Sequence, residues 1–178
     1  MKLEEILQQG ARVMWVAAHP DDEAFAGPIL AYSSIVCRNP MYFLVLTKGE
    51  GGECCFKRGE DGADLASIRT AEMKKVAELY RAQLQLESFF NAPLPMSSFP
   101  SRSELAQIWT EQKEPVGLVS AAILGFKPDV LITMSPIHGA TGHPEHQLAA
   151  RYAMAGVKKA GEEGHSVANC YYMLHKSK

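Results

Sequence analysis

The chain has 178 residues, of which 47% are hydrophobic and 21% charged, and its formal net charge is −2 at pH 7. This length favours a single domain with its own core, and the composition is that of an ordinary globular protein. The charge is near zero and there is no basic stripe, which argues against nucleic acid as a partner, and no apolar run is long enough to span a bilayer. Residues 1–10 lack a basic flank followed by an apolar stretch, so we expect a cytoplasmic protein.

Apolar runs alternate with helical periodicities along the chain. Continuously apolar runs predict strands buried on both faces at residues 13–18, 41–47 and 130–134, and shorter strands are expected at 83–89 and 170–174. Apolar residues spaced three and four apart predict helices at about 22–37 (with a kink at Pro28), 65–81, 116–126 and 144–159, and one more that is capped by Ser101 or Ser103 and ends at about 112. This alternation predicts an α/β fold, a Rossmann-like three-layer sandwich with a mostly parallel sheet.

Parallel sheets bind ligands beyond the carboxyl ends of their strands, which here selects the loops after residues 18, 47 and 134. Two of these loops are rich in histidine and acidic residues, namely His19, Asp21 and Asp22 in the first, and His143, Glu145 and His146 in the third. Because both loops should meet at one edge of the sheet, imidazoles and carboxylates would converge there. These are the ligands of zinc or a similar divalent ion, so we expect a metal site at the carboxyl ends of the strands.

Local spacing supports the same site. His143 precedes Pro144, and proline is favoured at the first helical position, so His146 should lie one helical turn from His143. The positive end of this helix disfavours protonation of His146 and keeps it available as a ligand.

The motif AHPDDE (18–23) after an apolar strand, followed by GHPEH (142–146), resembles the LmbE-like, or PIG-L, family of zinc-dependent N-acetylglucosaminide deacetylases. The resemblance covers most of the chain and includes LTKGEGG (46–52) and IRTAEM (68–73). It implies a single domain over residues 1–178 that lacks the usual C-terminal part of the family. It also implies a zinc-dependent deacetylase, a hydrolase of a linear amide C–N bond, with one Zn²⁺ per chain. Fe²⁺, Co²⁺ or Mn²⁺ would suit the same ligand types.

The resemblance also implies roles by motif position. The residues that would hold zinc are His19, Asp22 and His146. Asp21 would act as the general base, and His143 would stabilise the oxyanion or protonate the leaving amine. Arg69 would contact the substrate. The resemblance implies a place behind the metal ligands for Glu145, which departs from the family pattern because it stands where aspartate is more usual and has the longer side chain.

The motifs specify the metal and not the substrate. The leading expectation is removal of the N-acetyl group from an N-acetylglucosamine-type sugar or sugar conjugate, which releases acetate and a free amine. One alternative is the same hydrolysis on a non-sugar acyl amide, and another is a non-catalytic metal-binding partner subunit of this fold. The first strand is followed by HPDDE and not by a glycine-rich phosphate turn, which disfavours a nucleotide-binding module.

We therefore expect a small N-acetylated sugar or conjugate as the partner, with neither nucleic acid nor a membrane, and the sequence leaves room for a homo-oligomer. It assigns no role to His138 or to the adjacent pair Cys54 and Cys55.

Overall fold

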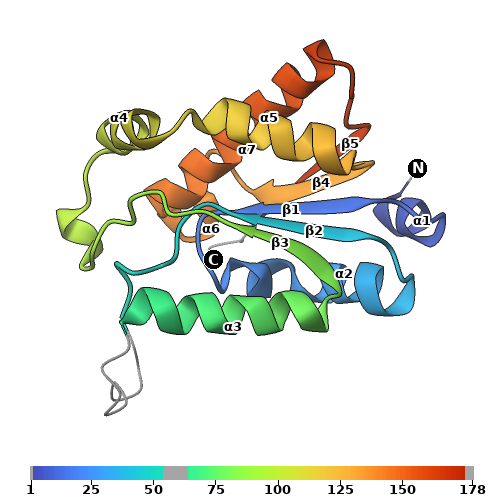
Figure 1. Cartoon of the computed structure of the whole chain (residues 1–178), viewed down its shortest axis with the longest axis horizontal. Helices are drawn as coiled ribbons and strands as arrows, with labels where there is room; N and C mark the ends of the chain where they lie inside the picture. Colours follow the sequence, from blue (N-terminus) through green and yellow to red (C-terminus); the bar gives the residue numbers. More distant parts are fainter. Residues whose placement is uncertain (1, 54–63, 175–178) are drawn as a thin grey trace.

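The computed structural model describes residues 2–53 and 64–174, and its centre is one five-stranded sheet (Figure 1). The strands are β1 (Val13–Ala17), β2 (Met41–Val45), β3 (Ala82–Leu86), β4 (Val130–Met134) and β5 (Asn169–Met173). Their order is β3-β2-β1-β4-β5, and every neighbouring pair is parallel. The predicted α/β sandwich with a mostly parallel sheet is confirmed.

Helices cover both faces of the sheet (Figure 1). One face carries α2 (Gly27–Ala31) and α3 (Leu65–Leu79), and the other carries α5 (Pro115–Phe126) and α7 (Pro144–Glu162). The remaining helical elements are α1 (Leu3–Gln8), η1 (Asp22–Ala26), η2 (Tyr32–Val36), η3 (Met96–Ser98), α4 (Arg102–Gln112) and α6 (Gly139–Gly142).

The segment after β1 is not the single kinked helix expected at 22–37. It consists of the 3-10 turn η1, the short α-helix α2 and the π-helical turn η2. Pro28 lies in the first turn of α2, where its missing N–H costs no hydrogen bond, so the chain starts a new helix there instead of continuing the first. Helix α1 was not predicted, because a six-residue helix that buries only Leu7 has little periodicity to detect.

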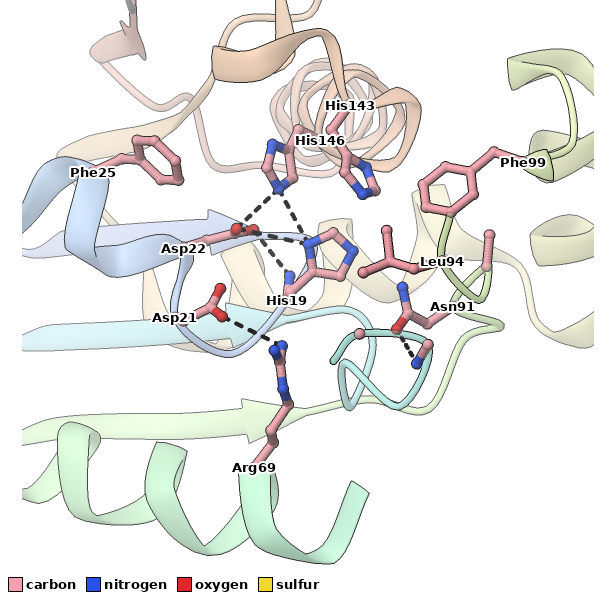
Figure 2. A pocket seen from close by; sticks show the side chains of 13 residues that line it. His19, Asp21, Asp22, Phe25, Arg69, Asn91, Leu94, Phe99, His143 and His146 are labelled. Atoms are coloured by element: carbon pink, nitrogen blue, oxygen red, sulfur yellow. Dashed lines mark hydrogen bonds and ion pairs between the residues drawn. The ribbon is translucent and has the colours of Figure 1, made fainter. Parts of the chain in front are cut away.

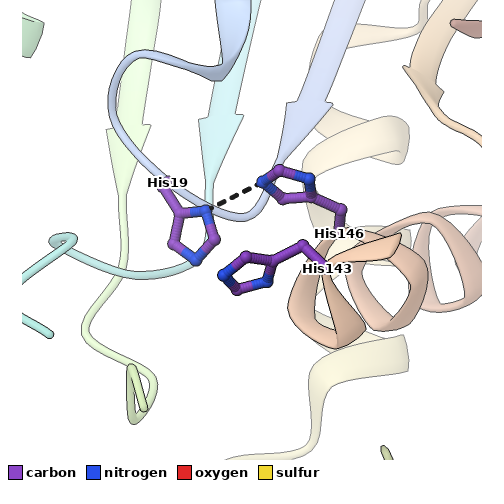
Figure 3. Close-up of side chains that lie close together, drawn as sticks. All are labelled: His19, His143 and His146. Atoms are coloured by element: carbon purple, nitrogen blue, oxygen red, sulfur yellow. Dashed lines mark hydrogen bonds between the residues drawn. The ribbon is translucent and has the colours of Figure 1, made fainter. Parts of the chain in front are cut away.

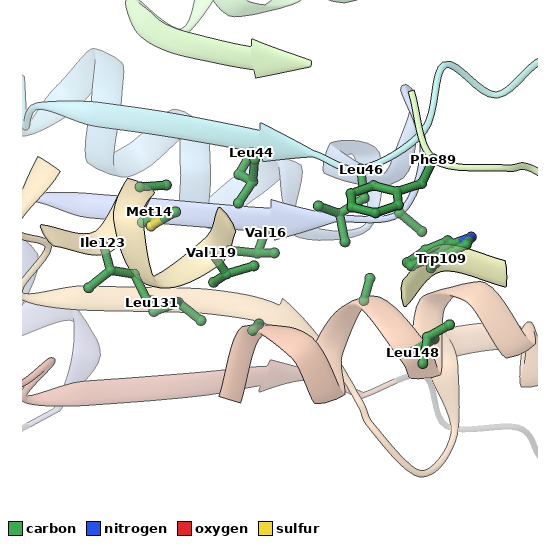
Figure 4. Close-up of a cluster of buried hydrophobic side chains, with 14 of the residues drawn as sticks. Met14, Val16, Leu44, Leu46, Phe89, Trp109, Val119, Ile123, Leu131 and Leu148 are labelled. Atoms are coloured by element: carbon green, nitrogen blue, oxygen red, sulfur yellow. The ribbon is translucent and has the colours of Figure 1, made fainter. Parts of the chain in front are cut away.

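The core has two halves, one on each face of the sheet. Strand β1 is buried along its whole length, with Met14 and Val16 facing one half and Trp15 facing the other. Figure 4 shows the first half, where Trp109 of α4 packs on Phe89 with the ring centroids 5.2 Å apart. Burial on both faces explains why the central strands are continuously apolar instead of alternating.

Side chains cap the N-termini of α3 and α4. Asp64 Oδ1 accepts a hydrogen bond from Ser67 N at the start of α3, and Ser101 with Glu104 forms a capping box at the start of α4. Of the two serines expected to cap this helix, Ser101 is the one that does so. Among residues 2–53 and 64–174, no helix combines the length and apolar character needed to cross a membrane.

Gly156 lies where α7 packs on α5, and a Cβ there would be 2.4 Å from Val119 Cγ1 and 3.2 Å from Ser120 N. We expect Gly156→Ala to lower the free energy of unfolding by about 1–3 kcal/mol, because overpacking separates the two helices. The matched control is Gly161→Ala on the same helix, whose Cβ would meet Ser166 Oγ at 3.7 Å. It should raise stability by up to about 1 kcal/mol. Urea unfolding measures both values, and equal stability of the two variants would contradict this packing.

Candidate metal centre

The structure brings the two histidine and acid motifs together at the carboxyl edge of the sheet. His19 follows β1, Asp22 begins η1, and His146 lies in the first turn of α7. His146 Nε2 is 2.9 Å from Asp22 Oδ1 and 3.1 Å from His19 Nδ1, and the latter is 3.6 Å from Asp22 Oδ1. All three side chains are buried. Figure 2 shows them converging from β1 and α7.

The backbone orients the carboxylate of Asp22. Its Oδ2 accepts hydrogen bonds from the N–H groups of Ala18 and His19, at 3.0 Å and 2.9 Å. Its Oδ1 therefore faces the two imidazoles. Burial raises the pKa of Asp22, but the charge of His19 and the hydrogen bonds from both histidines lower it by more. The pKa of Asp22 is therefore well below the usual value for aspartate. Asp22 is an ionised carboxylate pointed at two ring nitrogens.

In each imidazole, the ring nitrogen that faces away from Asp22 already has a hydrogen-bond partner. His146 Nδ1 lies 2.7 Å from the carbonyl oxygen of Gly139, which can only accept, so this nitrogen carries the proton. His19 Nε2 lies 2.5 Å from Glu145 Oε2, and an ionised carboxylate also only accepts. When the two histidines are neutral, the other nitrogens, His19 Nδ1 and His146 Nε2, therefore carry no proton. Each directs a lone pair at Asp22 Oδ1.

Three electron-pair donors that face one another repel unless a cation lies between them. In the protein alone that cation is a proton. Burial lowers the pKa of His19, but Asp22 and Glu145 raise it to about 10. Ligands of a tetrahedral ion bound at about 2.0–2.2 Å lie roughly 3.3–3.6 Å apart, close to the separations found here. The donor set therefore fits a divalent metal ion.

His143 belongs to the same cluster in a different way. One ring nitrogen from each of His19, His143 and His146 lies within 4.8 Å of the other two, and Figure 3 shows the three rings together. As the N-cap of α7, its Nδ1 accepts a hydrogen bond from the N–H of Glu145, which leaves Nε2–H for the neutral ring. Burial and the charges of His19 and His146 lower the pKa of His143 to about 4. Near neutral pH this ring is an uncharged hydrogen-bond donor.

Asp21 points away from its neighbour Asp22. Its backbone is left-handed, with φ of 90°, and its side chain is 65% exposed, against 1% for that of Asp22. Arg69 Nη1 of α3 lies 3.3 Å from Asp21 Oδ2. Burial and the charge of Asp22 raise the pKa of Asp21, and the charge of Arg69 offsets part of this rise. The two adjacent acids thus have different surroundings and can do different chemistry.

Glycines hold the guanidinium of Arg69 in place. A Cβ at Gly49 would lie 2.6 Å from Arg69 Nη1, and one at Gly52 would lie 2.9 Å from Nη2. Gly49 also has φ of +70°, which favours glycine. The glycine-rich loop predicted after β2 therefore lies directly against a predicted site residue.

Glu145 lies behind the cluster and is fully buried. Its Oε2 accepts from His19 Nε2 and Asn91 Nδ2, and its Oε1 accepts from the N–H of Ala92. The sequence predicts Glu145 behind the metal ligands but does not indicate Asn91. The only signal near Asn91 is a turn-rich stretch, which says nothing about a contact 54 residues away.

A cavity of about 230 Å³ opens beside the cluster. Its polar side includes Asp21 and Arg69, and its other walls carry Phe25, Leu94 and Phe99 (Figure 2). Phe25 and Leu94 are each 39% exposed and form part of the rim.

The sequence suggests no role for His138, Cys54 or Cys55. His138 is exposed just before α6 and is not a member of the cluster. Cys54 and Cys55 fall outside the described residues.

Comparison with known proteins identifies the family and the fold. Residues 14–157 match the family model described as PIG-L, GlcNAc-PI de-N-acetylase. One relative, a 1D-myo-inositol 2-acetamido-2-deoxy-alpha-D-glucopyranoside deacetylase from Mycobacterium sp. (strain KMS), is 31% identical over 163 residues, which cover 84% of this chain and 51% of the relative. The protein of the same name from Mycolicibacterium smegmatis is 31% identical over 151 residues, with 78% and 50% covered. The chain thus spans about half the length of these curated relatives.

Two solved structures share the fold at low sequence identity. N,N'-diacetylchitobiose deacetylase from Pyrococcus horikoshii has a TM-score of 0.62 at 17% identity, covering 100% of this chain and 66% of that one. GalB, the 4-carboxy-2-hydroxymuconate hydratase from Pseudomonas putida KT2440, has a TM-score of 0.64 at 20% identity, with 86% and 58% covered. Since these two proteins have different activities, the fold alone does not decide the chemistry.

We expect a divalent transition-metal ion to stabilise the chain. Zn²⁺ or Co²⁺ at about 100 times its Kd should add about 2.7 kcal/mol to the free energy of unfolding, because the ion binds the folded cluster. Asp22→Ala and His146→Ala should each remove this gain in a thermal-shift titration. The control His138→Ala should keep it. An equal gain in all four proteins would place the ion elsewhere.

Proposed function

The chain belongs to the PIG-L family, and on that premise we propose that it is a metal-dependent deacetylase. The substrate is an N-acetylglucosamine-type sugar or sugar conjugate, and the products are acetate and a free amine. The observation that carries this proposal is the meeting of His19, Asp22 and His146 around one point, with Asp21 and His143 beside it. The names of the relatives, deacetylases of a 2-acetamido sugar, support the choice of substrate.

We assign the metal to His19 Nδ1, His146 Nε2 and Asp22 Oδ1, with zinc as the expected ion. Two neutral imidazoles and one carboxylate are a ligand set found in catalytic zinc sites. When bound, such an ion supplies Lewis acidity, which acidifies water and polarises a carbonyl group. We leave His143 out of the ligand set, because Asp22 brings a negative charge and its Oδ1 lies 2.9 Å from His146 Nε2 and 3.6 Å from His19 Nδ1.

Asp21 acts as the general base in this scheme. Its carboxylate lines the cavity and is not held by the backbone amides that fix Asp22. It takes a proton from the water whose oxygen attacks the amide carbon, and passes that proton to the nitrogen as the C–N bond breaks. A raised pKa makes Asp21 a stronger base than an ordinary carboxylate, and Arg69 keeps its side chain directed into the pocket.

His143 acts as a hydrogen-bond donor to the amide oxygen. A proton on its Nε2 is available because Nδ1 accepts from the N–H of Glu145. Its pKa of about 4 keeps the ring neutral near pH 7, which suits stabilisation of the oxyanion better than donation of a proton to the amine. Of the two roles expected from the family resemblance, we therefore propose the first.

The size of the cavity suits one sugar ring. About 230 Å³ lies just below the usual range for small-molecule sites, so we propose that the N-acetylated ring enters and the rest of a conjugate lies across the rim. Arg69 can donate to ring hydroxyls from the polar side, and Phe25 and Leu94 offer apolar contacts at the rim. The cytoplasmic location expected from the sequence stays a prediction.

The test is acetate release from N-acetylglucosamine, its glycosides and short chitooligomers. The assay uses protein loaded with Zn²⁺ and the same protein after chelation. Release that stops on chelation and returns with metal supports the proposal. No release from any sugar by protein that holds zinc would favour a non-sugar amide or a non-catalytic subunit instead.

Asp21→Asn should lower kcat by about 10²- to 10⁴-fold, because the amide side chain cannot accept the proton from water. Metal content, measured by atomic absorption, should not change. The control Glu78→Gln removes an exposed acid from α3 and should leave kcat within about twofold of wild type. Turnover near the wild-type rate in Asp21→Asn would show that another group is the base.

His143→Ala should keep the metal and lower kcat by about 10²- to 10³-fold, the usual loss for one oxyanion donor. Metal titration and initial rates on the same preparation separate the two effects. Loss of the metal together with activity would instead make His143 a ligand.

A further inference from the structure

Asn91 joins the metal cluster to the glycine-rich loop, although it belongs to neither motif. It lies between β3 and η3 and is 7% exposed (Figure 2). Its Oδ1 accepts a hydrogen bond from Gly51 N at 2.6 Å, and its Nδ2 donates to Glu145 Oε2 at 2.7 Å. Because a backbone N–H only donates and an ionised carboxylate only accepts, these partners fix the orientation of the amide.

The first contact acts on the metal side. Glu145 Oε2 is shared between Asn91 Nδ2 and His19 Nε2, while Oε1 is held by the N–H of Ala92. The carboxylate is therefore fixed at both oxygens and aimed at His19. Without Asn91, a fully buried charge would lose one of its three donors, and the carboxylate would turn to recover it. The tautomer that leaves His19 Nδ1 free for a metal depends on this orientation.

The second contact acts on the substrate side. Gly51 packs so closely on the neighbouring segment that a Cβ would lie 2.3 Å from the carbonyl oxygen of Ala92. Gly49 and Gly52, on either side of Gly51, form the surface on which the guanidinium of Arg69 lies. The hydrogen bond from Gly51 N to Asn91 thus sets the position of the loop that holds Arg69.

We infer that Asn91 is a positioning residue that couples the metal ligand His19, through Glu145, to the loop that holds Arg69. This inference rests on the proposed function, which assigns His19 to the metal and Arg69 to the substrate. It adds that metal affinity and substrate affinity both depend on the buried side-chain amide of Asn91.

The experiment measures Co²⁺ affinity and the visible Co²⁺ spectrum without substrate, and then KM and kcat with Zn²⁺. Asn91→Ala should weaken Co²⁺ binding by about 10- to 100-fold, the usual effect of losing a group that orients a ligand, and should alter the spectrum. KM should rise about 2- to 10-fold through loss of the bond to Gly51. Asn91→Leu keeps the side-chain volume without either hydrogen bond and should behave alike, so poor folding of the alanine variant does not end the test.

Asn39→Ala is the matched control. Asn39 is also buried, and its Nδ2 donates to Leu7 O and Ser33 Oγ away from the cluster. Its loss should lower stability but leave Co²⁺ affinity, the spectrum and KM unchanged. Equal Co²⁺ affinity in wild type and in both Asn91 variants would overturn the inference, as would equal losses in the Asn39 and Asn91 variants.

A double-mutant cycle tests whether Asn91 acts through Glu145. In the background of Glu145→Gln, Asn91→Ala should weaken Co²⁺ binding by less than about twofold while still raising KM. Additive losses of affinity would overturn this route. Wild-type protein that binds Co²⁺ but releases no acetate would contradict the proposed function and leave the metal half of the inference standing. Wild-type protein that binds no Co²⁺ would overturn both.

Discussion

The hydrogen bond between His19 Nε2 and the buried carboxylate of Glu145 is the contact on which the rest of the site depends. A charge with no exposure is costly to bury unless donors surround it, and here they come from His19, Asn91 and Ala92. The same bond takes up one nitrogen of His19 and directs the other toward Asp22 and His146. One carboxylate thus ties α7, the loop after β1 and the segment after β3 together, and it decides which atoms face the pocket.

The neighbouring acids Asp21, Asp22 and Glu23 are compatible with one fold because the backbone separates them. With φ of 90°, Asp21 turns its carboxylate toward Arg69, while Asp22 turns inward to the amides of Ala18 and His19. Glu23 Oε2 accepts from the N–H of Asp21 at 3.1 Å. A left-handed backbone is unfavourable for most residues, but aspartate tolerates it better than most, and here the contacts on both sides hold it.

The pocket combines two kinds of surface that meet at the metal cluster. Its polar side, with Asp21 and Arg69, belongs to β1–η1 and α3, whereas Leu94 and Phe99 belong to the connection between β3 and α4. The T-shaped contact of Phe99 on His143, with centroids 5.1 Å apart, limits access of water to the ring that we propose as the oxyanion donor. Leu94 and Phe99 therefore come from a different segment than the metal ligands, whereas Phe25 shares η1 with Asp22.

The sequence by itself determined the parallel sheet, the edge at which the site lies and the motifs that meet there. Continuous apolar runs report burial on both faces, and parallel strands place their carboxyl ends together wherever the loops lead. Only the tertiary structure decided that Glu145 reaches His19, 126 residues away in the sequence, and that Asn91 donates a hydrogen bond to the same carboxylate. It also decided that the guanidinium of Arg69 lies against Gly49 and Gly52. It also decided the division of residues 22–36 into three short helices. The physical reason is that periodicity and spacing record each residue's local surroundings, whereas the partner of a buried polar group depends on how distant loops pack.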